Sequence, residues 1–339
     1  MKQYKIQKIN SDNFDISFLK NVSFPQAFFY GNWQENLGRD VKRYVVSCDD
    51  TNVAYFQMVK YPLLFGKSYF YIPYGPVTND FSDDFFIFIK QELQKIAQME
   101  GAVFIRLDFS PTVKNDTLLK FFKKTPRSSY HSAYFQPRAE LFLPLDKTEN
   151  EILMDMHQKT RYSIRLAEKK DITTEIITEN FEEYFESFYD LMFATAKRNN
   201  FGIHEKKYYD YIFKNASDTK TYLSIAKYNE KILAIDLIIV LNGVANYVFG
   251  GSSADERNRM PTYLAQWVAI LHAKKMGCDY YNFGAISADK DSHKGWDGIT
   301  TFKKKFGGKE MLHSDFFDIV TNPFLYHLYN FRKFLKSIM

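Results

Sequence analysis

The alternation of apolar and polar residues in the first third of the chain predicts a small sheet, a helix and a further strand. Residues 49–52 (Asp-Asp-Thr-Asn) separate two runs rich in β-branched and aromatic residues, which indicates a hairpin. Residues 82–99 have an acidic start followed by apolar side chains at helical spacing, and they predict a helix. A short helical or irregular segment is expected around 24–33. The strands are expected at 41–48, 51–63, 67–77 and 102–109.

The rest of the chain predicts a second unit with a similar order of elements. Thr148 is expected to cap a helical segment at 148–170, with Glu151 as its capping-box partner. Further helices are expected at 181–197, 208–215 and 262–276, and a last amphipathic helix opens at Asn322-Pro323. The strands are expected at 138–145, 172–178, 221–229, 232–242, 244–253 and 279–286. The repeated order indicates two duplicated α/β (α+β) domains.

Composition limits the classes of protein that remain. The net charge of +5 and the pI near 8.8 suit a phosphate-bearing partner or an anionic membrane surface, but not a dedicated DNA-binding domain. Two cysteines without a CxxC motif argue against a disulfide framework and a zinc ribbon. The first residues lack the apolar segment of a signal peptide, and no run of about 18 apolar residues occurs. A cytoplasmic protein is therefore expected.

Common catalytic motifs are missing from the sequence. It contains no GxSxG, HExxH, GxxxxGK[ST] or GxGxxG motif, and the spacing of its seven histidines suggests no metal cluster. The chemistry is therefore expected to be undemanding, or to draw on an already activated substrate.

Three stretches nevertheless have the composition of a functional site. Residues 159–170 place Arg161, Arg165 and Lys169 on one helix face, as a solvated surface or as a stripe for phosphates of tRNA or a lipid head group. Residues 249–270 place Gly250-Gly251 at the expected end of a strand, followed by a helix whose amides could face an anion or carbonyl oxygen. Residues 300–308, TTFKKKFGG, suit a charge run, an anion cradle or a catalytic cation.

Together with IPYGPV at 72–77, IRLDF at 105–109 and YYNFGAI at 280–286, these stretches resemble, in order, the FemABX family of aminoacyl-tRNA-dependent peptidyltransferases. The similarity extends over nearly the whole chain. It implies two acyl-CoA N-acyltransferase-like (GNAT-like) domains, each a twisted mixed sheet flanked by helices. The expected ranges are 1–145, joined by the C-terminal helix at about 322–339, and 146–321.

The resemblance also implies an activity. The family transfers an amino acid from aminoacyl-tRNA to the side-chain amine of the third residue of the peptidoglycan stem peptide, building the interpeptide bridge of the cell wall. The precursor is lipid II or UDP-MurNAc-pentapeptide, and no metal or organic cofactor takes part. The protein is expected to be a monomer in the cytoplasm, with peripheral contact at the inner face of the membrane.

Residue roles are carried over from the matching motifs. Lys303, directly after Phe302, matches the lysine that stabilises the oxyanion, and Asp108 matches an aspartate of the cleft. No general base is assigned. The residues implied for substrate binding are Phe302, Tyr208, Tyr209, Arg198, Phe249 and Tyr263, and those for tRNA or phosphate contact are Arg161, Arg165, Lys169, Lys304 and Lys305.

Three positions depart from the pattern of family members that use the soluble, UDP-linked precursor. Glu205 and Asn32 replace basic residues, and Phe249 replaces a tyrosine, so these departures favour lipid II. The absence of the long helical hairpin found in several lipid II-using relatives points the other way. Two alternatives are an acetyl-CoA-dependent enzyme, which would need a Q/RxxGxG/A loop that is absent, and a non-catalytic binding protein, which the retained Phe-Lys pair disfavours.

Overall fold

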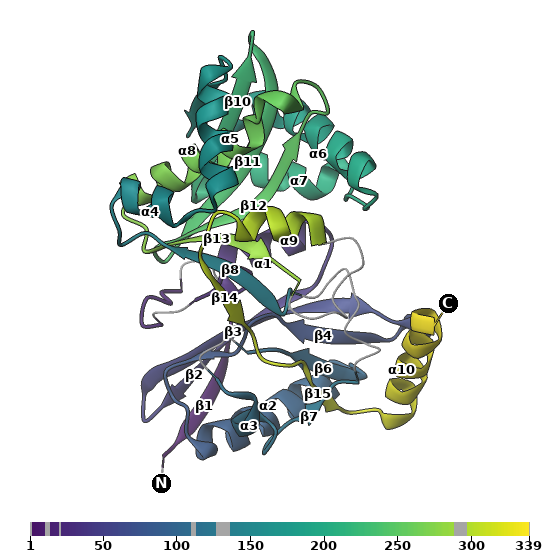
Figure 1. Cartoon of the computed structure of the whole chain (residues 1–339). Coiled ribbons are helices and arrows are strands. Elements are labelled where there is room, and N and C mark those ends of the chain that lie inside the picture. Colours follow the sequence, from purple (N-terminus) through teal and green to yellow (C-terminus); the bar gives the residue numbers. More distant parts are fainter. Residues whose placement is uncertain are drawn as a thin grey trace. The chain divides into compact units, whose positions relative to one another are not determined.

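The computed structural model describes residues 2–10, 14–19, 22–109, 113–126, 136–287 and 297–338 (Figure 1). The chain forms two compact units. The first consists of Met1–Arg138 together with Leu312–Met339, and the second of Ala139–Met311. No helix in the described part of the chain combines the length and apolar character needed to cross a membrane.

The first unit is built on a mixed sheet. Its strands follow the order β1-β2-β3-β4-β6-β15-β7, and β5 pairs with β3. Strands β4 and β6 are parallel, whereas the other neighbours are antiparallel. The strands are β1 (Tyr4–Ile9), β2 (Val41–Cys48), β3 (Thr51–Pro62), β4 (Ser68–Ile72), β5 (Val77–Thr78), β6 (Phe104–Leu107), β7 (Lys123–Lys124) and β15 (Phe317–Val320).

Helices cover both faces of this sheet. Helix α2 buries Phe85, Ile89 and Leu93 in a core with residues of one face, including Ile105 of β6. Successive strand residues point to opposite faces, so Phe104 lies on the other face, where its ring meets those of helix α10. The helical elements are η1 (Phe24–Gln26), α1 (Phe28–Asn36), η2 (Leu64–Gly66), α2 (Asp83–Met99), α3 (Asn115–Leu118) and α10 (Pro323–Ile338).

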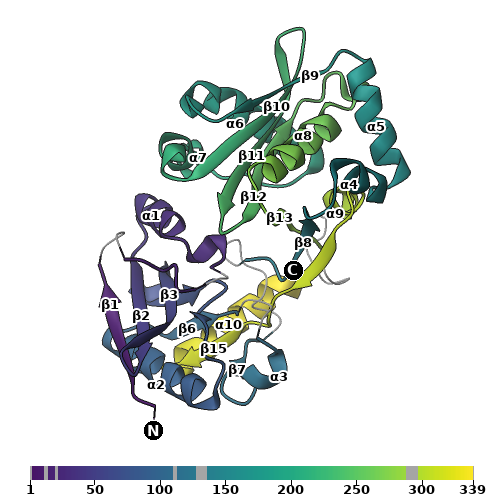
Figure 2. The ribbon, with the colours of Figure 1, turned by 90° about the vertical axis from the view of Figure 1, so that its left-hand side faces the viewer.

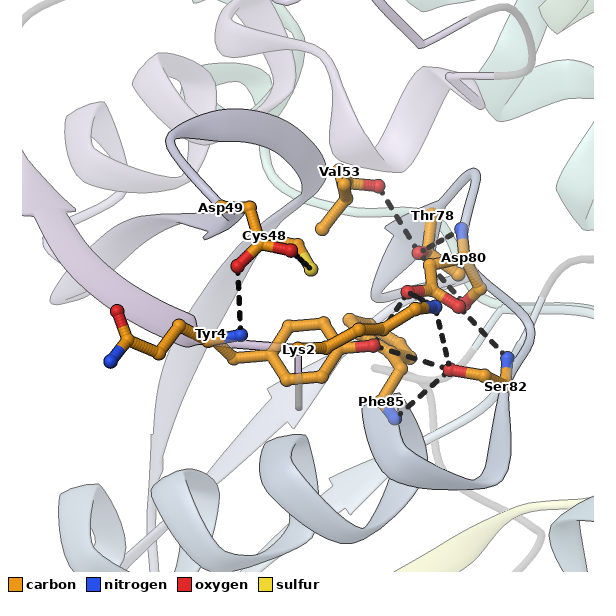
Figure 3. A network of polar contacts seen from close by, with 10 residues as sticks. Lys2, Tyr4, Cys48, Asp49, Val53, Thr78, Asp80, Ser82 and Phe85 are labelled. Atoms are coloured by element: carbon orange, nitrogen blue, oxygen red, sulfur yellow. Dashed lines mark hydrogen bonds and ion pairs between the residues drawn. The ribbon is translucent and has the colours of Figure 1, made fainter.

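A polar network joins β1 to the start of α2 (Figure 3). Asp80 accepts hydrogen bonds from Lys2 Nζ at 2.9 Å and from the Tyr4 hydroxyl at 2.6 Å. Ser82 donates its amide to Asp80 at 3.0 Å, and its hydroxyl caps α2 by accepting from the Phe85 amide. Burial alone would raise the pKa of Asp80, but these hydrogen bonds hold it below its ordinary value. Each member has a structural partner, so we assign the network to stability.

A buried ion pair connects β6, β15 and α10. Arg106 donates from Nε and Nη2 to the two carboxylate oxygens of Asp318, both at 2.7 Å. Tyr326 of α10 donates its hydroxyl to Asp318 at 2.7 Å. Arg106 is fully buried and Asp318 is 3% exposed, so removing either partner would leave a charge buried without its counterion.

The second unit contains another mixed sheet, in the order β14-β8-β13-β12-β11-β10-β9. Strands β12 and β13 are parallel but pair only over Val244–Asn246 and Tyr280–Asn282. The antiparallel strands β10, β11 and β12 are joined by tight turns at the predicted positions. The strands are β8 (Ala139–Pro144), β9 (Thr173–Ile177), β10 (Lys220–Tyr228), β11 (Lys231–Leu241), β12 (Val244–Ser252), β13 (Tyr280–Ala285) and β14 (Lys309–Leu312).

Helices also flank the second sheet on both faces (Figure 2). Helix α6 packs against β12, where a Cβ at Gly251 would lie 2.5 Å from the backbone of Leu191 and of Met192. Helix α8 covers the opposite face. The capping box of Thr148 and Glu151 is present at the start of α4. The helical elements are α4 (Glu149–Asp155), α5 (Gln158–Lys169), η4 (Phe181–Tyr184), α6 (Phe185–Asn199), α7 (Lys206–Lys214), η5 (Ala216–Asp218), η6 (Arg257–Arg259), α8 (Pro261–Lys275) and α9 (Asp297–Lys304).

The predicted fold class is confirmed, since both units are mixed sheets flanked by helices. The limits of the units differ from the sequence-based ranges at both ends of the second unit. Residues 139–144 belong to the second unit because they pair with β13, and residues 317–320 belong to the first unit because they pair with β6. The strand expected at 244–253 is β12, in which Gly250 and Gly251 both pair with β11 and which ends at Ser252.

Candidate active site

Lys303 lies on the buried side of α9, a helix that the sequence analysis did not predict. Its side chain points inward with that of Thr300; Lys303 is 6% exposed and Thr300 is 7% exposed. Three residues further on, Phe306 is fully buried. The run of three lysines therefore has one member in the protein interior, which is unusual for an ammonium group.

The Lys303 ammonium lies at the point where β12 and β13 stop pairing. Its Nζ donates a hydrogen bond to the Ala285 carbonyl oxygen at 2.8 Å and lies 5.8 Å from the centre of the Tyr247 ring. The register of β13 shifts between Asn282 and Ala285. Gly284, within this irregularity, has a φ of 71°, a conformation that favours glycine and turns the strand so that the next carbonyl reaches the lysine.

Burial determines the electrostatics of Lys303. It lowers the pKa of the ammonium from 10.5 to about 8, while the nearby negative charge of Glu140 opposes the shift. Glu140 accepts a hydrogen bond from the side-chain Nδ2 of Asn282 at 3.1 Å. Because water hardly reaches this cation, it interacts strongly with any negative charge that develops beside it.

A second buried polar group lies on the neighbouring strands. Asp236 of β11 is 1% exposed, and burial raises its pKa to about 8, while hydrogen bonding to Gln266 and Tyr247 opposes the rise. A Cβ at Gly250 would lie 2.1 Å from the Tyr247 hydroxyl and 2.4 Å from Asp236 Oδ1. Gly250 therefore leaves room for this pair, and Tyr247 extends from the carboxyl group of Asp236 to the ammonium of Lys303.

Phe302, which precedes Lys303 in the sequence, belongs to a group of packed aromatic rings. The Phe302 ring lies 5.1 Å from Tyr263 of α8 and 5.2 Å from Phe306, and Phe306 also stacks on Tyr263. Phe302 and Tyr263 are both half-buried. The structure thus brings these two predicted substrate-binding residues together, next to the predicted catalytic lysine.

The other two lysines of the run have different surroundings. Lys304 is exposed and forms a 2.6 Å ion pair with Glu310. Lys305 is half-buried, and its backbone carbonyl accepts hydrogen bonds from the His157 amide and the Thr160 hydroxyl. These contacts anchor the end of α9 to the start of α5.

Tyr208, Tyr209 and Phe249 form an aromatic cluster with His204. The Tyr209 ring lies 5.0 Å from Phe249, and the Tyr208 ring stacks on His204 at 3.7 Å. Tyr209 is 1% exposed and its hydroxyl accepts a hydrogen bond from the His204 amide, whereas Tyr208 is half-buried. Of the two tyrosines named as alternatives, Tyr208 is the one whose ring remains accessible.

The polar residues near this cluster have structural partners. Arg198 donates to the Ser252 carbonyl at 2.9 Å and to its hydroxyl at 3.0 Å, which fixes the end of β12. Burial and the positive charge of Arg257 lower the pKa of Arg198. Glu205 is exposed and forms a 3.1 Å ion pair with Lys207. An acidic side chain at this position does not favour a diphosphate.

The basic stripe of α5 divides into two parts. Arg161 donates to the carbonyl oxygens of Met154 and Met156 and so caps the end of α4. Arg165 and Lys169 are exposed on the same helix. Only these two have the exposed side chains of the predicted phosphate-contacting stripe.

Asp108 lies in the first unit, immediately after β6. Its Oδ1 accepts the Tyr74 amide at 2.9 Å. Burial raises the pKa of Asp108 to about 7, while hydrogen bonds from Tyr74 and Tyr71 and the charge of the nearby His313 oppose the rise. The His313 ring stacks on Tyr74 at 3.8 Å. In the same unit, Asn32 accepts a hydrogen bond from Arg43 at 2.6 Å.

Several of these groups were not identified from the sequence. Asp236 interrupts the apolar run ILAIDLIIVL, and a carboxylate inside an otherwise apolar strand was the one signal that could have identified it as a site residue. Tyr247, Glu140 and His313 gave no comparable signal. Within the described residues, no group of three or more His, Cys, Asp and Glu side chains is arranged to hold a metal ion.

Comparisons with known proteins agree with the fold and the motifs. The chain is 22% identical over 332 residues to a lipid II:glycine glycyltransferase of Staphylococcus aureus (strain USA300), covering 76% of this chain and 78% of the relative. A crystal structure of FemX superposes with a TM-score of 0.82 at 20% identity, covering 96% of this chain and all of that chain. A tandem GNAT protein from the clavulanic acid biosynthesis pathway gives a TM-score of 0.55 at 10% identity, covering 93% and 98% of the two chains.

The family comparison extends over most of the sequence. The model of the FemAB family matches residues 10–231 and 219–333, which include every motif on which the resemblance was based. On this evidence, the chain belongs to the FemAB family.

Proposed function

We propose that this protein is an aminoacyltransferase that moves an amino acid from aminoacyl-tRNA to the side-chain amine of the third stem-peptide residue of a peptidoglycan precursor. The observation that carries the proposal is the buried Lys303 ammonium at the point where β12 and β13 separate. Membership of the FemAB family and similarity to a lipid II:glycine glycyltransferase support the same reaction class.

The role of Lys303 follows from the chemistry of aminolysis. The acceptor amine attacks the ester carbonyl, a tetrahedral oxyanion forms, and the ribose oxygen leaves as the amide forms. The ammonium of Lys303 stabilises the oxyanion, and because the group is buried the interaction is stronger than in water. The aminoacyl ester is already activated, so the protein mainly has to orient the two substrates and stabilise this charge.

The reaction is completed when the acceptor amine loses a proton and the departing ribose oxygen gains one. Asp108 is the candidate acceptor among the carboxyl groups named from the sequence, because a pKa raised to about 7 matches proton transfer near neutral pH. Asp236 is a poorer candidate, because its carboxyl group is buried beside the Tyr247 hydroxyl and Gly250, where a substrate amine at the protein surface would not reach it. We assign Asp236 and Tyr247 the role of positioning Lys303.

Charge supports the assignment of the tRNA donor. Arg165 and Lys169 are exposed on α5, and Lys304 is exposed at the end of α9. We propose that these side chains contact the phosphates of the tRNA, whereas Arg161 has a structural role. Such contacts weaken steeply as the salt concentration rises, which makes the salt dependence of tRNA binding a simple measure of their number.

The acceptor is proposed to be the lipid-linked precursor. Glu205 brings a negative charge to a position where a diphosphate would need a positive one. Asn32, the other departure from a basic residue, has no positive charge, and its side-chain oxygen accepts a hydrogen bond from Arg43. The half-buried Tyr208 and Phe249 remain available to pack against the stem peptide.

The test combines purified protein, total charged tRNA and each of the two precursors, with the products identified by mass. We expect a mass increase of one amino acid on the lipid-linked precursor. Lys303→Met should lower the rate by about 10²–10³-fold, the usual effect of removing an oxyanion-stabilising donor. Lys309→Met, which removes an exposed lysine of β14, is the control and should retain most of the rate. Full turnover by Lys303→Met would remove this lysine from the mechanism.

A further inference from the structure

Helix α10 has a buried face and an opposite, exposed apolar face. Tyr326 and Asn330 are 2% and 9% exposed, and Tyr326 donates a hydrogen bond to Asp318 of the first sheet. On the other side, a stripe repeats at intervals of four, three and four residues, which places its members on one face of a helix. This α10 stripe consists of Phe324, Leu328, Phe331 and Leu335, which are 78%, 42%, 59% and 41% exposed.

The charges of α10 are all of one sign. The sequence of Pro323–Ile338 contains Arg332, Lys333 and Lys336 and has no acidic residue. Arg332 is exposed next to the stripe. An exposed apolar stripe on a helix with only basic charges is typical of helices that lie in the interface of an anionic bilayer.

A second apolar group projects from the hairpin between β3 and β4. Phe65 is 80% exposed at the tip, Leu64 is 48% exposed, and Lys67 is the next charged residue. Phe65 has a φ of 58°, an uncommon conformation for a bulky residue. The tip leads into β4, where the Tyr69 ring lies 6.0 Å from Tyr329 of α10, so hairpin and helix are neighbours (Figure 1).

We propose that the α10 stripe and the hairpin tip together form a surface that binds an anionic phospholipid bilayer. Aromatic and leucine side chains would enter the acyl boundary, while Arg332 and Lys67 contact the lipid phosphates. The proposal rests on the proposed function for its purpose, because a lipid-linked acceptor is presented at a bilayer. A second copy of the chain is a poorer occupant, because a two-fold contact between two such helices would bring like charges together.

The test is flotation of the full-length protein with vesicles of phosphatidylcholine alone or mixed with phosphatidylglycerol. Wild type should float with the anionic vesicles. Replacing Leu328 and Phe331 together by Glu should weaken binding at least about tenfold. Met99→Glu is the matched control, because Met99 is 78% exposed at the end of α2, away from the stripe. Arg332→Gln should weaken binding about fivefold to anionic vesicles and leave neutral vesicles unaffected.

Two results would overturn the proposal. One is equal flotation of wild type and the double Glu variant, and the other is a halving of the sedimenting mass in that variant, which would show that the stripe contacts a second copy. Thermal unfolding confirms that the exposed substitutions leave the fold intact. Transfer to a water-soluble precursor analogue separates the two proposals, because the double variant should keep this activity. If no variant, including wild type, transfers an amino acid while flotation behaves as expected, only the proposed function fails.

Discussion

Replacement of Lys303 by Met is expected to stabilise the protein at pH 7 while it lowers the rate of transfer. The folded state lowers the pKa of this ammonium from 10.5 to about 8. A difference of roughly 2.5 pKa units corresponds to about 3 kcal/mol that disfavours the charged lysine in the folded protein. Met has a similar shape and no charge, so the variant is free of that cost.

Two other contributions reduce the net gain. Met cannot donate to the Ala285 carbonyl oxygen, and the lost hydrogen bond costs about 1 kcal/mol. The contact of the ammonium with the Tyr247 ring is also lost. We therefore expect a net stabilisation of about 1–2 kcal/mol at pH 7, which for a chain of 339 residues is a small but measurable increase in the free energy of unfolding.

The dependence on pH is the sharper measurement. Because the folded state lowers the pKa of Lys303, the unfolded chain binds more protons between about pH 8 and 10.5. Wild type therefore gains stability as the pH rises through this window, whereas the Met variant lacks this contribution. The stability difference between the two proteins should change in favour of wild type by about 2.5 kcal/mol from pH 7 to pH 10.

Urea unfolding of both proteins at several pH values provides the assay, and other titrating groups cancel in the difference. Lys304→Met, which removes an exposed lysine of the same run, serves as the control for the substitution of Lys by Met. A constant stability difference between wild type and Lys303→Met across the range would refute the argument that burial lowers the pKa of Lys303.

The other predictions concern the pH profile, a close contact and the buried ion pair. The rate of transfer should rise through about pH 7 as Asp108 loses its proton; Asp108→Asn should remove this acidic limb, and a variant that keeps it would exclude Asp108. Gly251→Ala should lower the free energy of unfolding, measured with urea, by about 2 kcal/mol or more, because the new Cβ would meet the α6 backbone. Gly202→Ala is the control: it has open space around it and should change the free energy of unfolding little. Asp318→Asn should cost about 3–5 kcal/mol by the same method, since it leaves Arg106 buried without its counterion; a loss below about 1 kcal/mol would contradict this.

Local signals in the sequence predicted much of the fold. Thr148 and Glu151 identified a helix start because a capping box depends on two residues three positions apart. The hairpins of the second sheet were predicted because their turns have Asn-Glu and Asn-Gly sequences between long apolar strands. By contrast, β15 has four residues and no clear period, so its position between β6 and β7 depends on long-range pairing that local patterns do not contain.

The candidate site was predictable only in part, for a similar reason. The motif identified Lys303, but the difference between Lys303 and Lys304 in burial arises from the orientation of α9 against β13. The roles of Gly250 and Asp236 depend on the pairing of β11 with β12, which brings the Asp236 carboxyl group and the Tyr247 hydroxyl together beside Gly250. Asp108 was identified by its place in a motif, whereas the neighbouring His313 is about 200 residues away in sequence and had no signal of its own.

The place of β15 in the first sheet has a consequence for synthesis on the ribosome. Translation delivers β6 early, but its neighbour β15 and the tyrosine of α10 that contacts Asp318 arrive only after the whole second unit has been made. During that interval β6 has an unpaired strand edge, and Arg106 has no counterion. The nascent chain is therefore most exposed to aggregation and proteolysis in its N-terminal part, and the unit that is translated first is the one that completes its folding last.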